Sequence, residues 1–198
     1  MPPTNPRKGW EGYYRANQDR PASPLLRRIL GPDLLPQGNR QAIDLGCGAG
    51  LETASLLNAR WNVLAIDREP RAIERVEALA AGQSGRLVTV TSCFEELEEL
   101  PSSALIHAGL SLPFCAPAGF PRLWALIAAA LEPGGIFVGH LFGDRHDWAS
   151  YPEMSFHTRE EVEALCSEFV IELLRESEGD GGLVPHHWHR FDIILRKS

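Results

Sequence analysis

The first group of residues suited to binding chemistry is a glycine-rich turn that contains Gly46, Gly48 and Gly50. Glycine adopts backbone conformations that other residues rarely reach, so such a turn lets the main chain approach a ligand closely. The turn follows a short apolar run and precedes a predicted helix over residues 51–59, whose first N–H groups face outward unpaired and attract negative charge. Asp44, on the strand side of the turn, can accept hydrogen bonds from the loop or bind an ammonium group. The stretch therefore predicts a ligand-binding loop at the end of a buried strand.

A second candidate group stands at the end of the next predicted strand. Residues 62–67 form an almost continuous apolar run that ends in Asp67, as expected for a parallel strand covered on both faces. A carboxylate at this place can accept hydrogen bonds from both hydroxyls of a ribose. It could instead cap the helix that Glu69 and Pro70 begin. Because loop, helix, strand and acid follow in this order, ribose binding is the better interpretation.

The spacing of the glycines separates two families of nucleotide-binding loop. The dinucleotide fingerprint G-x-G-x-x-G would need a third glycine where this chain has Leu51. The D-x-G-x-G-x-G pattern over residues 44–50 instead resembles motif I of the class I S-adenosylmethionine (SAM)-dependent methyltransferases. A helix followed by L-x-P-G-G at residues 131–135 and then an apolar strand is a second resemblance to this family. Together they cover residues 41–198 and imply SAM as the cofactor, with S-adenosylhomocysteine (SAH) as its product.

The resemblance implies a set of cofactor-binding residues at the carboxyl ends of the first four strands. Where the family commonly has an acid that binds the adenine amino group, this chain has Cys93, so the Phe94 N–H, apolar contacts or Glu95 are expected to hold the adenine. The full set of expected cofactor contacts is Asp44, Gly46, Cys47, Gly48, Gly50, Asp67, Arg68, Cys93, Phe94, Glu95, Gly109 and Leu110.

The stretch after the fourth strand faces the methyl group in this family. Residues 111–114, Ser-Leu-Pro-Phe, faintly resemble the [DNS]-P-P-[YFW] motif of amine-directed nucleic-acid methyltransferases, but a leucine replaces the first proline. They are interpreted mainly as a pocket wall. The residues expected to contact the methyl acceptor are Arg20, Ser111, Phe114, His140 and His146.

Histidines gather near the predicted ligand edge, and a loop over residues 186–189 is expected to reach it. Histidine can take a proton from a thiol or an amine near neutral pH. We therefore predict His187, His189 and Arg190 as catalytic residues, with the two histidines on one face if the segment is extended. Packing or hydrogen-bonding roles for these histidines remain open alternatives. The His-x-His pair lacks a third ligand at suitable spacing, so no metal site is predicted.

Alternating strands and helices predict an α/β fold: a Rossmann-like, doubly wound, mostly parallel seven-stranded sheet with an antiparallel last strand. Residues 1–198 are interpreted as one methyltransferase domain, with an N-terminal helical cap over 1–38 and a SAM-binding core over 39–198. The cap contains Trp10, Tyr13 and Tyr14 and either packs on the sheet or closes as a lid. An acidic, glycine-rich loop is expected between the last two strands, at residues 176–182. The other expected strands are 42–45, 87–91, 104–109, 136–142, 170–174 and 188–196, and the other helices are 23–30, 70–80, 120–131 and 158–168.

Composition limits the classes of partner. A chain of 198 residues with 44% hydrophobic and 23% charged residues is typical of one globular domain. The formal net charge of −7 argues against a nucleic-acid partner. The sequence begins without the apolar core of a signal peptide and has no apolar stretch long enough to span a bilayer. Four scattered cysteines are read as reduced thiols, so we expect a cytoplasmic protein without a membrane partner, as a monomer or homodimer.

Within the family, the chain is most similar to the small proteins related to tellurite-resistance methyltransferases. This rests on the glycine loop, a lead-in over residues 13–21 that ends in Arg20 and Pro21, residues 152–158 before the late helix, and the ending over residues 189–197. The expected function is transfer of a methyl group from SAM to a small-molecule acceptor: a thiol, a metalloid oxyanion or an amine. The alternatives are a module that binds SAM without transferring methyl and an NAD-dependent oxidoreductase, which the glycine spacing opposes.

Overall fold

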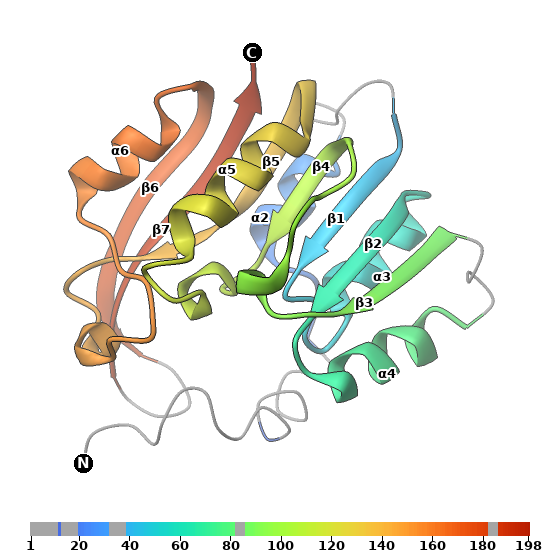
Figure 1. Cartoon of the computed structure of the whole chain (residues 1–198), viewed down its shortest axis with the longest axis horizontal. Helices are drawn as coiled ribbons and strands as arrows, with labels where there is room; N and C mark the ends of the chain where they lie inside the picture. Colours follow the sequence, from blue (N-terminus) through green and yellow to red (C-terminus); the bar gives the residue numbers. More distant parts are fainter. Residues whose placement is uncertain (1–11, 13–19, 32–38, 82–85, 182–185) are drawn as a thin grey trace.

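The computed structural model describes residue 12 and residues 20–31, 39–81, 86–181 and 186–198. Its centre is one seven-stranded sheet with the strand order β3-β2-β1-β4-β5-β7-β6 (Figure 1). The strands are β1 (Gln41–Leu45), β2 (Asn62–Asp67), β3 (Leu87–Thr91), β4 (Ser103–Ala108), β5 (Leu131–Phe142), β6 (Phe169–Gly181) and β7 (His186–Lys197).

Neighbouring strands from β3 across to β5 are parallel, whereas β7 runs antiparallel to both β5 and β6. The predicted fold class is therefore confirmed, including the antiparallel last strand. Because β1 and β4 are neighbours although the chain visits β2 and β3 between them, the connections reverse direction beside β1. Ligands of open α/β sheets bind at such a reversal, outside the carboxyl ends of the strands.

Helices cover both faces of the sheet. They are α2 (Pro24–Ile29), α3 (Leu51–Asn58), α4 (Pro70–Leu79), α5 (Phe120–Ala130) and α6 (Arg159–Cys166), with short 3-10 turns η2 (Phe94–Glu96), η3 (Leu112–Phe114) and η4 (Asp147–Ser150). The first three helices share one apolar core with alternate residues of the strands. The last two share the other core. None of these helices, over the described ranges, is long and apolar enough to cross a membrane.

Of the predicted cap over residues 1–38, the described part contains α2. Ser23 caps this helix by accepting a hydrogen bond from the Leu26 N–H at 3.1 Å, and Leu26 and Ile29 are fully buried against the sheet. This helix therefore packs on the sheet, and the role of the cap as a whole stays a prediction. The aromatic residues Trp10, Tyr13 and Tyr14 lie outside the described residues.

The predicted loop at residues 176–182 was wrong, because β6 continues to Gly181 and pairs with β7 from His186. The segment was misassigned because its residues are acidic and glycine-rich rather than apolar. Charged partners across the strand pair replace apolar contacts there: the His187 ring lies 2.9 Å from Glu178 Oε1 and 3.0 Å from Asp180 Oδ1. For the same reason residues 186–189 lie in a strand, not in the expected loop.

The L-x-P-G-G segment forms an irregularity inside β5 rather than a turn before it. Leu131 pairs with Ser103, and Ile136 pairs with Leu105, so four residues of β5 face a single residue of β4. Gly134 turns through the left-handed region there, with φ +78°. This bulge adjusts the register before β5 enters the core.

One phenylalanine and one valine of the sheet differ sharply in burial, which gives a test of the core. Phe137 is fully buried and its ring meets Trp124 edge-on at 5.2 Å. We expect Phe137→Ala to lower the free energy of unfolding by about 3–5 kcal/mol, because the cavity left behind cannot collapse fully. Val88→Ala on edge strand β3, where the valine is 62% exposed, should cost less than about 1 kcal/mol. Urea denaturation measures both, and equal losses would contradict this description of the core.

Candidate functional site

The glycine-rich loop joins β1 to α3 at the carboxyl edge of the sheet. Its three glycines are all left-handed, with φ of +74°, +51° and +82° at Gly46, Gly48 and Gly50. The Gly46 and Cys47 N–H groups both donate to the Ile66 carbonyl of β2, at 2.7 and 3.1 Å. Burial, with the nearby charge of Asp44, raises the pKa of the Cys47 thiol far above its usual range. Cys47 is therefore a packed thiol within the loop and not a nucleophile.

Loops from three strands meet at Gly46. A Cβ placed on Gly46 would lie 2.3 Å from Ser111 Cβ and 3.6 Å from the Phe94 ring. Ser111 also donates a hydrogen bond of 2.5 Å to the Leu45 carbonyl. The predicted contacts Gly46, Phe94 and Ser111 are thus brought together, and only glycine fits between the other two.

Asp67 links the ends of the first two strands. Its Oδ2 accepts from the Gly48 N–H and its Oδ1 accepts from the Glu69 N–H, both at 2.9 Å. Burial raises the pKa of this carboxyl, although the two N–H groups act against the shift. No side chain among the described residues caps the first turn of α4, because Asp67 accepts from the N–H of Glu69, which is itself the N-cap residue of the helix. This bond uses one lone pair of Oδ1 and leaves further acceptor capacity on both oxygens for a polyol.

Asp44 does not face outward but lies beneath the loop, 1% exposed. Its Oδ2 accepts from the Thr53 hydroxyl at 2.6 Å, and its Oδ1 lies 2.8 Å from His107 Nδ1. The expected contact with a ligand ammonium group has no support in this arrangement, because both oxygens already have partners within the protein. His107, on β4, was not among the predicted site residues. Its position within an apolar strand opposite an aspartate was the available clue.

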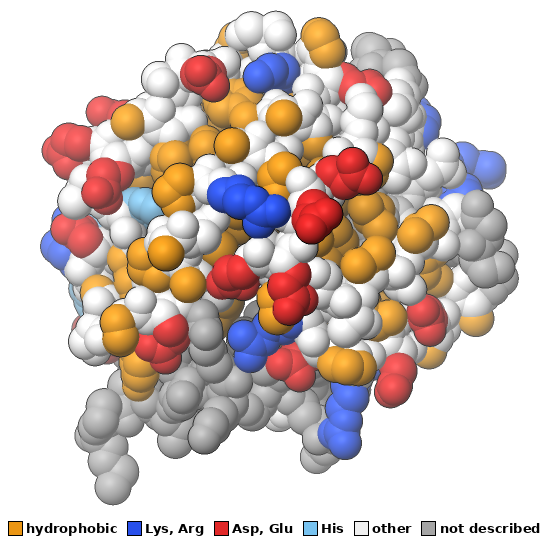
Figure 2. Space-filling model, viewed as in Figure 1, with side chains coloured by type: hydrophobic (Ala, Val, Ile, Leu, Met, Phe, Trp, Pro, Cys, Tyr) orange, Lys and Arg blue, Asp and Glu red, His pale blue; other side chains and the backbone are white. Residues whose placement is uncertain are grey.

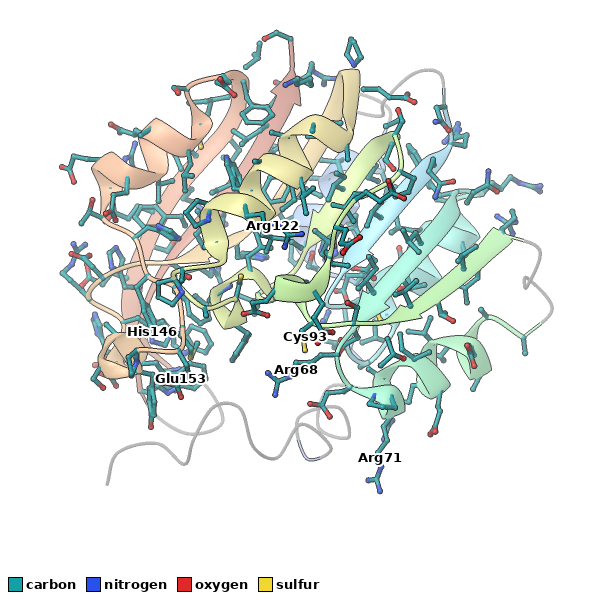
Figure 3. The ribbon with its side chains drawn as sticks, in the orientation of Figure 1. Arg68, Arg71, Cys93, Arg122, His146 and Glu153 are labelled. Carbon is teal, nitrogen blue, oxygen red and sulfur yellow. The ribbon has the colours of Figure 1, made fainter. Side chains whose placement is uncertain are left out.

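The segment after β3 is held by side chains of its own. In Figure 3, Arg68 and Cys93 lie together at the lower edge of the sheet, after β2 and β3. Glu95 accepts from the Ala116 N–H at 2.8 Å, so this carboxylate fixes the stretch after η3. Arg122 of α5 donates to the Glu95 carbonyl at 3.0 Å. Among these residues, Phe94 lies beside the glycine loop, with its ring 3.6 Å from a Cβ placed on Gly46.

The turn after β4 has an unusual backbone. Leu110 has a left-handed φ of +59°, a conformation that is strained for a residue with a branched side chain. The preceding Gly109 makes room for the His107 ring, since a Cβ there would lie 2.7 Å from His107 Cε1. Gly109 and Leu110 therefore form a strained, closely packed turn at the ligand edge.

Apart from Ser111 at the glycine loop, the predicted acceptor residues fall into three environments. Arg20 forms a bidentate ion pair with Glu52 of α3, at 2.7 and 3.1 Å. His140 is buried on β5, 3.6 Å from Asp192 Oδ1. Phe114 and His146 belong to an aromatic cluster at the end of β5 and the start of β7, which we call the aromatic cluster from here on. It contains Phe114, Phe142, His146, Trp148, Phe156, His186 and Trp188.

The predicted catalytic residues lie in a network of charges on β7. His189 is fully buried, with Nδ1 accepting from the Arg145 N–H at 3.1 Å and Nε2 lying 2.8 Å from Glu176 Oε1. His187 contacts Glu178 and Asp180, which raise its pKa. Arg190 donates to Asp192 at 2.7 Å. Each of the three already has partners within the protein, so their catalytic role stays a prediction.

The alternation of side chains along the strands sorts these groups between the two faces. Asp44, His107, His140 and Asp192 lie on the face that α2, α3 and α4 cover, since Ala42, Leu105, Val138 and Ile194, two positions away, belong to that core. His189 lies on the other face, because Phe191 belongs to the core beneath α5 and α6. The predicted acceptor residue His140 and the predicted catalytic residue His189 are therefore on opposite faces of the sheet.

Known proteins resemble this chain in sequence and in structure. Residues 42–135, which include the glycine loop, Asp67 and the turn after β4, match a family model described as a methyltransferase domain. This part of the chain, slightly less than half of it, is therefore similar to methyltransferase domains. Solved structures share the fold of this chain. TehB from Haemophilus influenzae has a TM-score of 0.72 at 13% identity over 80% of this chain and 57% of TehB. The N-methyltransferase NodS from Bradyrhizobium japonicum, in complex with SAH, has a TM-score of 0.62 at 15% identity over 93% and 98% of the two chains.

Curated relatives match parts of the chain. Ribosomal RNA small subunit methyltransferase H from Rhodospirillum centenum is 41% identical over 78 residues, which are 39% of this chain and 24% of that protein. Carboxy-S-adenosyl-L-methionine synthase from Trichlorobacter lovleyi is 28% identical over 108 residues, 52% of this chain and 44% of the synthase. The matches thus cover less than half the length of either relative.

Gly46 and Gly134 form a matched pair for testing the loop. Both have a left-handed φ, but a Cβ on Gly134 would meet no atom within 4 Å, whereas one on Gly46 would overlap Ser111. We expect Gly134→Ala to cost about 1 kcal/mol of unfolding free energy from the backbone alone. Gly46→Ala should cost about 1–3 kcal/mol more, from overpacking, and should weaken SAH binding by calorimetry. Equal effects of the two variants would contradict the crowding at Gly46.

The His146 ring makes stability sensitive to acid. It is 2% exposed, and burial, with the charge of His186, lowers its pKa to about 4. Since the unfolded chain binds the proton near pH 6.5, its stabilising effect is present above that pH and is lost as the pH falls toward 4. From pH 7.0 to 4.5 we expect the histidine to account for a loss of about 2–3 kcal/mol. His146→Gln should lose less over this range in urea titrations, and parallel curves for the two proteins would contradict the assignment.

Proposed function

We propose that this chain transfers the methyl group of SAM to a small-molecule acceptor that bears a nucleophilic sulfur, nitrogen, oxygen or metalloid atom. The observation that carries the proposal is the joint between β1 and β2. Three left-handed glycines and the Asp67 carboxylate meet there, in a domain that matches the methyltransferase model.

The residues at this edge fit the chemistry of SAM. The loop over residues 46–50 supplies backbone groups and close approach for the methionyl part. Asp67 would accept from the ribose hydroxyls, and Cys93 and Phe94 would lie against the adenine, with Arg68 and Leu110 beside them. Asp44 would act beneath the loop by holding Thr53 at the start of α3. SAM supplies an activated methyl group on a sulfonium, so most of the acceleration can come from positioning the acceptor in line.

A small acceptor accords with the surface better than a nucleic acid does. The net charge is −7, and Figure 2 shows Lys and Arg side chains scattered singly among Asp and Glu on the face that it presents. A nucleic-acid binder needs a contiguous basic surface to displace counterions. The ribosomal RNA methyltransferases among the relatives cover too little of either protein to transfer their substrate to this chain. Ser111 and Phe114 therefore serve as wall residues, together with His140 and His146, for a compact acceptor.

The proposal is tested by following SAH release from SAM with a panel of acceptors: tellurite, selenite, small thiols, small amines and a short ribosomal RNA fragment. Turnover with a small acceptor and none with the RNA is the expected result. Turnover with the RNA and with none of the small acceptors would show that the acceptor is a nucleic acid instead of a small molecule. SAH binding without turnover on a broad panel would favour a module that holds SAM without transfer, and binding of NADH instead of SAH would favour an oxidoreductase.

Replacing Asp67 tests the cofactor assignment directly. Asp67→Ala should weaken SAH binding by about tenfold or more in calorimetry, because charge-assisted hydrogen bonds to the ribose and to the loop are lost together. Asp144→Asn is the matched control, since this half-exposed carboxylate follows β5 at the same edge without contacting the loop. An unchanged SAH affinity in the folded Asp67→Ala protein would exclude the ribose contact.

A further inference from the structure

The most unusual group that the predicted roles do not explain is the buried pair of Asp44 and His107. The two are 2.8 Å apart, and their exposed fractions are 1% and 2%. Asp44 is itself fixed by the Thr53 hydroxyl. A carboxylate at Nδ1 selects the tautomer in which Nδ1 carries the proton, so Nε2 of the neutral ring is an acceptor. This Nε2 is buried and has no hydrogen-bond partner among the described residues.

His107 Nε2 lies at the turn that follows β4. A Cβ placed on Gly109 would be 3.0 Å from it, so the nitrogen occupies the space that a side chain at position 109 would fill. Leu110, with its left-handed φ, comes next. An unpartnered acceptor therefore stands at the carboxyl edge, beside the strained turn and on the face that α2 and α3 cover.

A second imidazole lies on the same face of the next strand. His140 Nε2 is 3.6 Å from Asp192 Oδ1, and its Nδ1 is buried without a partner among the described residues. Burial, with the charge of Arg190, lowers the pKa of His140 to about 3, so this ring stays neutral. One imidazole nitrogen without a partner among the described residues thus lies on each of β4 and β5, on the same face of the sheet, and each ring lies near a carboxylate.

We propose that His107, held by Asp44, takes the proton from the methyl acceptor, which binds at the ends of β4 and β5 on the α2–α3 face. The acceptor is accordingly a protic nucleophile, a thiol, an amine or an alcohol, and not a thioether or a metalloid lone pair without a proton. This deepens the proposed function and rests on it. It also assigns proton transfer to the opposite face from His187 and His189.

The proposed step moves one methyl group and one proton. The lone pair of the acceptor atom X forms the X–CH3 bond while the bond from that carbon to sulfur breaks, and its electron pair stays on sulfur, which leaves neutral SAH. The proton of X–H moves to His107 Nε2. The imidazolium that results is stabilised by Asp44, and it returns the proton to solvent when the products leave.

The charges around His107 set the pH range of this step. Burial lowers its pKa, but the hydrogen bond and charge of Asp44, with Glu52 of α3, outweigh burial and a smaller opposing effect of Arg20, so the pKa is raised. His140 of β5 also faces it and stays neutral. The ring accepts a proton only above its pKa, so kcat/KM should rise with pH to a plateau, with a midpoint above 6.5.

The test compares His107→Gln with His157→Gln and His189→Gln. His157 is the matched control, a half-buried ring on Phe120 beneath α5 whose Nε2 also has no partner among the described residues. The probes are 2-mercaptoethanol and ethanolamine, which lose a proton, and dimethyl sulfide, which does not. SAH calorimetry on each variant comes first. Failure of the wild-type chain to bind SAH would defeat the proposed function itself, separately from this inference.

If SAH binding is kept within about twofold, His107→Gln should lower kcat for the protic probes by about 100-fold or more. The variant should also lose the acid limb, which is the fall of kcat/KM at low pH. Its deficit with 2-mercaptoethanol should shrink above the pKa of the thiol. His157→Gln should keep the wild-type rates and the wild-type pH dependence of kcat/KM. Any of three results would overturn the proposal. His107→Gln could keep the wild-type rates, the acid limb could be lost in His189→Gln instead, or the wild-type chain could prefer dimethyl sulfide.

A measurement on the wild-type chain covers two remaining cases: a His107→Gln variant that does not fold, and SAH binding without turnover of the probes. In 15N-histidine NMR of the SAH complex, the resonance of His107 Nε2 should be that of an unprotonated nitrogen above its pKa. It should shift when 2-mercaptoethanol or ethanolamine is added. A protonated Nε2 at that pH, or no shift with either probe, would overturn the proposal.

Discussion

The structure depends on how the loop after β1 is fastened to the end of β2. Two successive N–H groups, of Gly46 and Cys47, converge on the Ile66 carbonyl, and Gly48 donates to Asp67 one residue later. This is possible only because the glycines turn through the left-handed region. Once the loop is fastened, α3 begins at a fixed place, and Ser111 and Phe94 can pack where Gly46 has no side chain. The cofactor edge is therefore one interlocked unit made from four strand ends.

A large part of this edge could be predicted from the sequence because the chemistry is local. Glycines at alternate positions, an acid at a strand end and a helix stop before an apolar strand each lie within a few residues, so spacing alone places them. The same reasoning failed at residues 176–182, where strand pairing depends on charged partners such as His187 and Glu178 from the other strand. Periodicity of apolar residues does not register such pairs.

Pairings across the sheet explain the other omissions. The environment of His107 is determined by Asp44, 63 positions earlier, and nothing in the sequence around either residue indicates the other. The sequence likewise does not show which residues lie on each face of β7. The register of β5 against β7 is needed to place His189 under α5 and α6 and to place Asp192 beside His140. The sequence thus places these residues near the edge but does not show on which face of the sheet each one lies.

The hairpin of β6 and β7 is held by two kinds of force along its length. Its base packs apolar residues such as Ile193 and Leu174 on the central core, whereas its tip relies on Arg145, which bridges Glu176 and Glu178 while half exposed. Exposed ion pairs weaken as counterions accumulate around them. Rising ionic strength should therefore loosen the tip alone, so its amides would exchange hydrogen faster while those of β1 and β4 stay protected. The aromatic cluster at this tip thus rests on an end of the sheet whose local stability follows the salt concentration.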